Sequence, residues 1–244
     1  MTLVSRPNTV SLVISLNSTP PKPQAATVPM AFIWTGGLGG STGSPQHTAS
    51  ATSVGHARPV IPPFDPTTGG LPRGRYLCSV DEIEALLVEA FEDSSTRSEC
   101  FQHWLQAKAM LDALAAGLVQ AAWVGGSFTT TKKDPDDVDA VFLLDAQVFD
   151  DLSNTSKGKI NKFNQKDWLR KKTGLRVESF IIVRRPVANP WDREGLDPEA
   201  LEYFSLRGRW DDWWMRARTD EDKTTPPTLV DAEPVRGYLE VIWP

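Results

Sequence analysis

Cysteine and histidine are scarce in this sequence of 244 residues, which contains two cysteines, Cys78 and Cys100, and three histidines. Structural zinc sites are usually built from four such ligands, grouped in pairs at short spacing. The sequence offers no such spacing, which excludes a zinc-finger or zinc-ribbon protein. So few cysteines also favour a reduced, cytoplasmic setting.

Long apolar runs are lacking as well. No uninterrupted apolar segment is long enough to span a bilayer, which takes about 20 residues. The apolar run at residues 10–16 is interrupted by serines and is at the lower limit for the core of a signal peptide. We therefore expect no membrane partner, no secretion and a cytoplasmic location.

Positive charge is in deficit over most of the chain. Residues 1–75 carry five Lys or Arg and one acidic residue, whereas the remainder carries 21 basic and 30 acidic residues and a net charge of −9. An acidic body of this kind argues against a protein that coats nucleic acid.

The N-terminal part of the chain has the composition of a linker. Residues 1–58 are rich in Ser, Thr, Pro, Gly and Ala, and such a segment buries too little apolar surface to offset the entropy of ordering it. Its glycine run at residues 36–41 lacks the Gly-Lys-Ser/Thr ending of a phosphate loop. We predict a disordered tail over residues 1–58, or a stretch upstream of the true start, and a folded domain over residues 59–244. The domain begins with a proline-rich extended arm at residues 58–75.

Two helices are expected at the start of the domain. Ser79 and Glu82 have the spacing of a capping box, and apolar residues follow at helical spacing. This pattern predicts a helix over residues 80–91. A second apolar stripe predicts a longer helix that starts near residue 95 or 96 and ends at Ala116, before a glycine.

Short apolar segments rich in β-branched residues predict four strands, at residues 120–124, 138–144, 175–183 and 237–243. Residues 198–218 have helical composition. Strands that alternate with helices predict an α/β fold. We expect a small mixed sheet flanked by helices.

The candidate site lies between the first two predicted strands. The turn Gly125-Gly126-Ser127 ends one strand, and Asp137 and Asp139 begin the next. Because side chains alternate along a strand, the two carboxylates project from the same face. Carboxylates are the ligands that hard divalent cations prefer. The plainer interpretation of the same residues is a glycine turn followed by an acidic strand start.

These residues resemble the signature of the polymerase-beta-like nucleotidyltransferase superfamily, which is Gly-Ser, a spacer and Asp-x-Asp. Here the signature is Gly126-Ser127, nine residues, and Asp137-Val138-Asp139. The surrounding residues look particularly like a group of small bacterial nucleotidyltransferase-like proteins. The resemblance covers residues 59–243 and implies an enzyme that transfers a nucleoside monophosphate from an NTP to a hydroxyl of RNA, protein or a small molecule. Relatives in toxin–antitoxin and phage-defence systems imply, by analogy, a cognate partner protein.

The resemblance also assigns metal ligands. Nucleotidyl transfer is driven by metals that neutralise charge on the attacking and leaving oxygens. Asp137 and Asp139 would bind Mg²⁺ or Mn²⁺, and a third carboxylate on a later strand would help bind the metal or activate the attacking hydroxyl. Glu178 is the best match for this third acid, although the family pattern has Asp there. Glu240 is the competing choice.

The nucleotide would lie on the glycine turn. Gly125 and Gly126 would let the backbone approach the triphosphate, and the amide and hydroxyl of Ser127 would contact its oxygens. Lys132 and Lys133, in the spacer, either add phosphate contacts or lie in a solvated loop.

Two other classes of function stay open. A degenerate nucleotidyltransferase would act as a non-catalytic regulatory or antitoxin-like binding protein. An RNA-binding protein would use the basic cluster at residues 157–176, in which Phe163 and Trp168 could stack a base. The same cluster is also typical of a solvated helix face.

Three tryptophans are expected on one face of the helix predicted over residues 198–218. They are Trp210, Trp213 and Trp214, spaced i, i+3 and i+4. We expect this face to pack against the sheet, and a partner-binding patch is the alternative.

Overall fold

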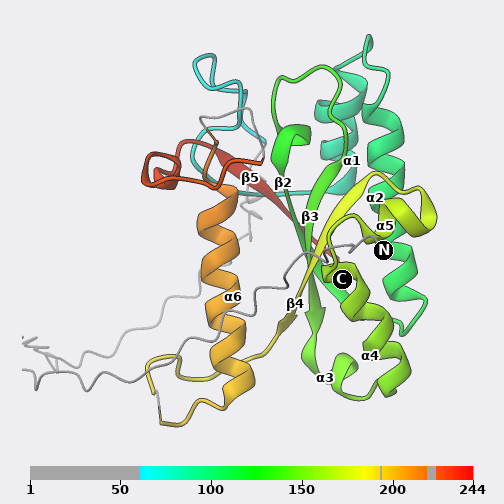
Figure 1. Cartoon of the computed structure of the whole chain (residues 1–244), viewed down its shortest axis with the longest axis vertical. Helices are drawn as coiled ribbons and strands as arrows, with labels where there is room; N and C mark the ends of the chain where they lie inside the picture. The colour runs from blue at the N-terminus through cyan, green and yellow to red at the C-terminus, as the bar shows by residue number, and fades with distance from the viewer. Residues whose placement is uncertain (1–60, 193, 219–223, 244) are drawn as a thin grey trace, which may run out of the picture. The chain divides into compact units, whose positions relative to one another are not determined.

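A computed structural model describes residues 61–192, 194–218 and 224–243 of the chain (Figure 1). The tail predicted over residues 1–58 lies outside the described residues. The chain divides into two units, residues 1–53 and 54–244, and all described residues belong to the second. None of the described helices has the length and apolar composition that crossing a bilayer requires.

A five-stranded mixed sheet forms the centre of the described unit, with the strand order β1-β5-β2-β3-β4. β1 pairs with β5 and β3 with β4 in parallel, while β2 is antiparallel to both of its neighbours. The α/β prediction is therefore confirmed. The strands in chain order are β1 (Gly74–Cys78), β2 (Val119–Gly125), β3 (Val138–Asp145), β4 (Val177–Arg184) and β5 (Gly237–Ile242).

Helices cover both faces of the sheet (Figure 1). One face carries most of them, and α6 (Pro198–Trp214) lies alone against the other. The remaining helices are α1 (Val80–Glu84), α2 (Arg97–Asp112), α3 (Ala146–Asp150), α4 (Asn154–Asn161) and α5 (Trp168–Thr173).

The first predicted helix begins with the expected capping box. The Glu82 amide donates to Ser79 Oγ at 3.1 Å, and the Ser79 amide donates to Glu82 Oε2 at 2.7 Å. The helix then continues beyond α1 through a π-helical segment, Ala85–Glu89.

The prediction missed one strand and misplaced the end of one helix. β1 was not predicted, because the sequence of this short, half-exposed edge strand follows a proline-rich arm. α2 ends at Asp112, whereas the apolar stripe predicted an end at Ala116. The chain turns back toward β2 over these last residues, and Gly117 takes a positive φ of 72°.

Alternation along β3 divides the core into two layers. Val138, Ala140 and Phe142 pack into the larger core with α2. Val141 and Leu143 pack into a smaller core that includes residues of α6. By the same alternation, Asp139 is on the α6 face of the sheet.

Gly237, the first residue of β5, gives a test of how closely β5 packs against the chain at Pro72 and Gly74. A Cβ there would lie 2.2 Å from the Pro72 carbonyl oxygen and 2.7 Å from the Gly74 carbonyl oxygen, both of them backbone atoms. Gly237→Ala should therefore lower the free energy of unfolding by about 1–3 kcal/mol or more, as measured by urea denaturation. Gly208→Ala, in α6, is the matched control, because a Cβ at Gly208 meets nothing within 4 Å. It should raise stability by up to about 1 kcal/mol; equal effects of the two changes would contradict the packing at Gly237.

Candidate functional site

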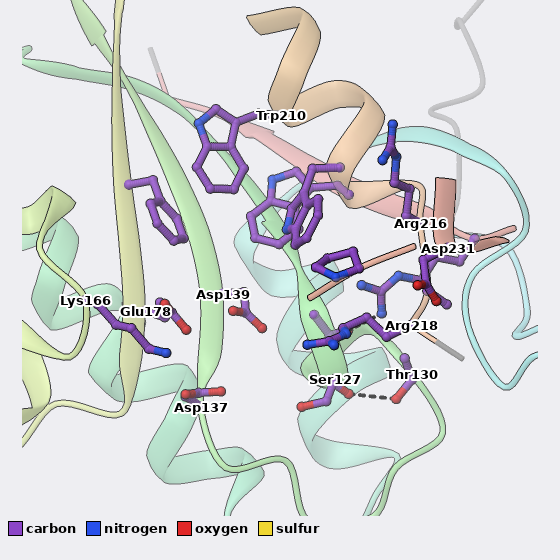
Figure 2. A pocket seen from close by; sticks show the side chains of 17 residues that line it. Ser127, Thr130, Asp137, Asp139, Lys166, Glu178, Trp210, Arg216, Arg218 and Asp231 are labelled. Atoms are coloured by element: carbon purple, nitrogen blue, oxygen red, sulfur yellow. Dashed lines mark hydrogen bonds between the residues drawn. The ribbon is translucent and has the colours of Figure 1, made fainter. Parts of the chain in front are cut away.

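A pocket of about 560 Å³ opens between the sheet and the C-terminal end of α6 with the chain that follows it. Its lining combines acidic, basic and aromatic side chains. Figure 2 shows Asp137, Asp139 and Glu178 on one side of the pocket, with Lys166 pointing toward them. Arg216, Arg218 and Asp231 lie on the other side. A pocket of this size accommodates a small-molecule ligand.

The structure brings the three predicted carboxylates to this pocket. Asp139 and Glu178 are partners in the parallel register of β3 and β4, so their side chains are neighbours on the same face of the sheet. Asp137 lies two residues before Asp139 and also lines the pocket.

Glu240, the competing third acid, has a different environment. Glu240 Oε1 accepts a hydrogen bond from Trp123 Nε1 at 2.9 Å, and Glu240 Oε2 lies 3.3 Å from Arg75 Nε. It is not among the residues that line the pocket. Glu178, which is paired with Asp139 in the sheet and lines the pocket, is therefore better placed than Glu240 to act with Asp137 and Asp139.

The two glycines of the turn are required for close packing inside the protein. Gly126 has a φ of 70°, and a Cβ there would lie 1.7 Å from Asp139 Oδ2. At Gly125 a Cβ would lie 2.8 Å from the Trp214 ring. Gly126 and Ser127 line the pocket, whereas Gly125 packs against the Trp214 ring and is not among the lining residues. Its contact with a ligand stays a prediction.

Lys132 and Lys133 do not line the pocket. Both are exposed, which supports the solvated-loop interpretation and not the phosphate contacts. The lysine at the pocket is Lys166, which precedes α5. The sequence analysis included Lys166 only as a member of the basic cluster at residues 157–176. The spacing of that cluster does not distinguish one lysine from the others.

Arg97, in α2, fixes the loop that carries the serine and leads to the aspartates. Its guanidinium is fully buried, and burial lowers the pKa of Arg97 to about 10. The group also lies over the Phe91 ring, 3.7 Å from the ring centroid. It donates to five backbone carbonyl oxygens, those of Leu87 (2.8 Å), Phe128 (2.9 Å), Thr130 (2.6 Å), Lys132 (2.6 Å) and Lys133 (3.2 Å).

An arginine also holds the start of β3. Arg170 Nη1 donates to Asp136 Oδ2 at 2.7 Å, and Arg170 Nη2 donates to Asp137 Oδ2 at 3.2 Å. The hydrogen bond from Arg170 keeps the pKa of Asp136 below its usual range. Asp137 thus has a cationic partner on the protein itself.

Sequence reasoning missed two arginines that line the pocket, Arg216 and Arg236. Arg216 and Arg236 come together because Met215 O accepts hydrogen bonds from the amides of Val235 (2.8 Å) and Arg236 (3.1 Å). Arg236 Nη1 donates to the Gly126 carbonyl at 3.3 Å, while its Nε is buried without a hydrogen-bond partner. Burial lowers the pKa of Arg236, and the charge of Asp139 opposes this shift. An incompletely paired guanidinium in a pocket is suited to an anionic ligand.

The two aromatic groups singled out in the sequence have different positions. Phe163 is 3% exposed and Trp168 packs against the same core, with their ring centroids 5.9 Å apart. Phe163 is therefore too buried to stack an RNA base. Trp210, Trp213 and Trp214 of α6 line the pocket instead.

The donor set fits a magnesium ion that is shared with a ligand. Within the described ranges, no three His, Cys, Asp or Glu side chains are gathered as a ready metal cage. Mg²⁺, however, is usually held by one or two carboxylates together with substrate phosphates. Asp137, Asp139 and Glu178, which line one pocket, have the chemistry for such a shared site.

Arg97→Lys tests whether the hydrogen bonds of Arg97 hold the loop between β2 and β3. Lysine keeps the charge but cannot reproduce the guanidinium fork, so buried carbonyls lose their donors. We expect the free energy of unfolding in urea to fall by about 3 kcal/mol. Arg209→Lys, at an exposed position of α6, is the control and should change it by less than about 0.5 kcal/mol. Similar values for the two variants would show that Arg97 does not hold the loop.

The comparisons with known proteins identify a family without an assigned activity. No curated protein and no solved structure matches the chain. Residues 62–241 match the model of a family whose description is "Family of unknown function (DUF6932)". The matched segment contains the whole pocket and all but the last residue of the sheet. The chain therefore belongs to the family of unknown function DUF6932.

Proposed function

We propose that this protein is a metal-dependent nucleotidyltransferase that transfers a nucleoside monophosphate from an NTP, such as ATP, to a hydroxyl group. The observation that carries the proposal is the register of β3 and β4, which sets Asp139 beside Glu178. Asp137 and the Gly126-Ser127 turn line the same pocket. This set agrees with the resemblance of the sequence to the polymerase-beta-like superfamily.

The carboxylates are the proposed metal site. Asp137, Asp139 and Glu178 would hold Mg²⁺ or Mn²⁺ together with the triphosphate. The bound ion would neutralise charge that develops on the attacking and leaving oxygens.

The residues of the chain then have distinct roles in the proposed reaction. Arg236 and Arg216 line the pocket together with the carboxylates and bind the phosphates, and the Ser127 amide and hydroxyl bind them at the glycine turn. The Ser127 carbonyl is already occupied, since it accepts from Thr130 Oγ1 at 2.7 Å. Glu178 accepts the proton of the acceptor hydroxyl. A bond forms between the acceptor oxygen and the α-phosphorus as the bond to the bridging oxygen of pyrophosphate breaks.

The proposed acceptor classes follow from the resemblance to the superfamily. We propose RNA, protein or a small molecule as acceptor, and a toxin–antitoxin or phage-defence system with a cognate partner protein as the context. The cytoplasm is the proposed compartment, which agrees with two free, buried cysteines.

One observation favours a second candidate, a non-catalytic nucleotidyltransferase-like binding protein. Arg170 forms an ion pair with Asp137 within the protein itself. If this ion pair persists when nucleotide binds, the site would hold a ligand without assembling the catalytic metal.

Transfer of labelled nucleotide tests the catalytic proposal. The full chain is incubated with each α-³²P-labelled NTP, Mg²⁺ or Mn²⁺, and total cellular RNA or protein as acceptor. We expect labelling that Asp137→Asn with Asp139→Asn abolishes, because the ligands of the metal lose their charge. The matched control, Asp93→Asn with Asp151→Asn, changes two exposed aspartates that lie outside this pocket and should label like the unchanged protein. Undiminished labelling by the first double variant would contradict the assignment.

Thermal denaturation separates the two candidates. A ligand at one hundred times its Kd stabilises the folded state by about 2.7 kcal/mol, so both candidates predict a higher Tm with an NTP and Mg²⁺. A higher Tm without any labelling would favour the non-catalytic binding protein. A flat response with all four NTPs would count against both, and salt-sensitive RNA affinity that survives loss of both aspartates would favour an RNA-binding protein.

A further inference from the structure

Four aromatic side chains form a wall of the pocket beside the carboxylates. Phe180 comes from β4, and Trp210, Trp213 and Trp214 come from α6. The ring centroids of Phe180 and Trp210 are 4.2 Å apart, and those of Trp210 and Trp214 are 5.2 Å apart. Figure 2 shows the Trp210 ring beside the space above Asp139 and Glu178.

Core packing explains only part of this wall. Trp214 is 3% exposed and covers Gly125, so its role is structural. Trp213, in contrast, is 41% exposed, and Trp210 is half-buried. Both line the pocket. Large apolar rings that stay open to a pocket offer surface to a ligand.

The position of the wall relative to the charges indicates what kind of ligand fits. Phe180 lies two residues beyond Glu178 on the same face of β4, and two residues advance a strand by about 7 Å. Arg216 and Arg236 line the pocket together with these residues. A ligand that reaches all three regions has an anionic part, a metal-binding part and a flat aromatic part. The separation of about 7 Å along β4 leaves room for a sugar between the metal-binding part and the aromatic part of such a ligand.

Resting on the proposed function, we propose that Trp210 and Trp213 form a stacking site for the base of the nucleotide. The wall presents the faces of indole and phenyl rings, so it recognises the base by the area of its π face. Purines present more area than pyrimidines. The site is therefore selective for purine nucleoside triphosphates over pyrimidine ones, and for both over inorganic tripolyphosphate.

Titration calorimetry on the full chain with Mg²⁺ tests the stacking site. The ligands are the α,β-methylene analogues of ATP and CTP, which are not cleaved, and tripolyphosphate, which has no base. We expect the ATP analogue to bind about ten- to a hundredfold more tightly than tripolyphosphate, as stacking contributions imply. The CTP analogue should lie between them.

Variants of the aromatic wall test whether it causes the difference in affinity between the ATP analogue and tripolyphosphate. Trp213→Leu and Trp210→Leu should each weaken binding of the ATP analogue about tenfold and leave tripolyphosphate affinity unchanged. Trp210→Phe, which keeps an aromatic face, should retain most of the affinity. Trp191→Leu is the control, because Trp191 is 88% exposed and is not among the residues that line the pocket.

The outcomes separate this inference from the function on which it rests. Equal affinity of the unchanged protein for the ATP analogue and tripolyphosphate would overturn the stacking site but not the triphosphate site. Parallel losses for both ligands in Trp213→Leu, whose exposed side chain can be changed without opening the core, would also overturn it. Binding of neither ligand in Mg²⁺ would overturn the proposed function, and the stacking site with it.

Discussion

The buried guanidinium of Arg97 is the contact on which the geometry of the pocket depends. The loop between β2 and β3 has no regular hydrogen-bond ladder of its own, and its buried carbonyl groups would be left without partners. Arg97 supplies five hydrogen bonds to backbone carbonyls, four of them within residues 128–133. One side chain of α2 thereby ties a helix on one face of the sheet to the loop that borders a pocket on the other. This arrangement holds the Gly126-Ser127 turn and the start of β3 in a fixed relation.

The sheet then sets the positions of the acidic groups. The parallel pairing of β3 and β4 brings Asp139 and Glu178 together although they are far apart in the chain. Gly126 allows the turn to approach Asp139 so closely that no side chain would fit between them. The Asp139 carboxylate therefore lies against the backbone of the turn, and an ion bound to it would be shared with any phosphate bound there.

Carboxylates and guanidinium groups line the same pocket. The carboxylates come from the sheet, whereas Arg216 and Arg236 come from the chain around the end of α6 and the start of β5. Both groups already have partners of opposite charge on the protein, since Arg216 pairs with Asp212 and the charge of Asp139 acts on Arg236. In the proposed complex, the anionic triphosphate would contact the guanidinium groups and the metal ion would contact the carboxylates. The ion pair of Arg170 with Asp137 compensates part of the carboxylate charge within the protein itself.

The sequence alone determined the elements and the faces of the candidate site. Capping at Ser79, glycine turns and strand periodicity are local properties, so they predicted α1, the strand containing Glu178 and the common face of Asp137 and Asp139. Only the tertiary structure decided which distant residues join them. Strand order and register brought Glu178 beside Asp139, left Glu240, Lys132 and Lys133 outside the lining of the pocket, and brought Lys166, Arg216 and Arg236 into that lining. Gly125 was interpreted as a ligand contact because no local pattern shows that Trp214 covers it. Periodicity fixes the direction of a side chain within its own element, but its neighbours across the fold depend on how the elements pack.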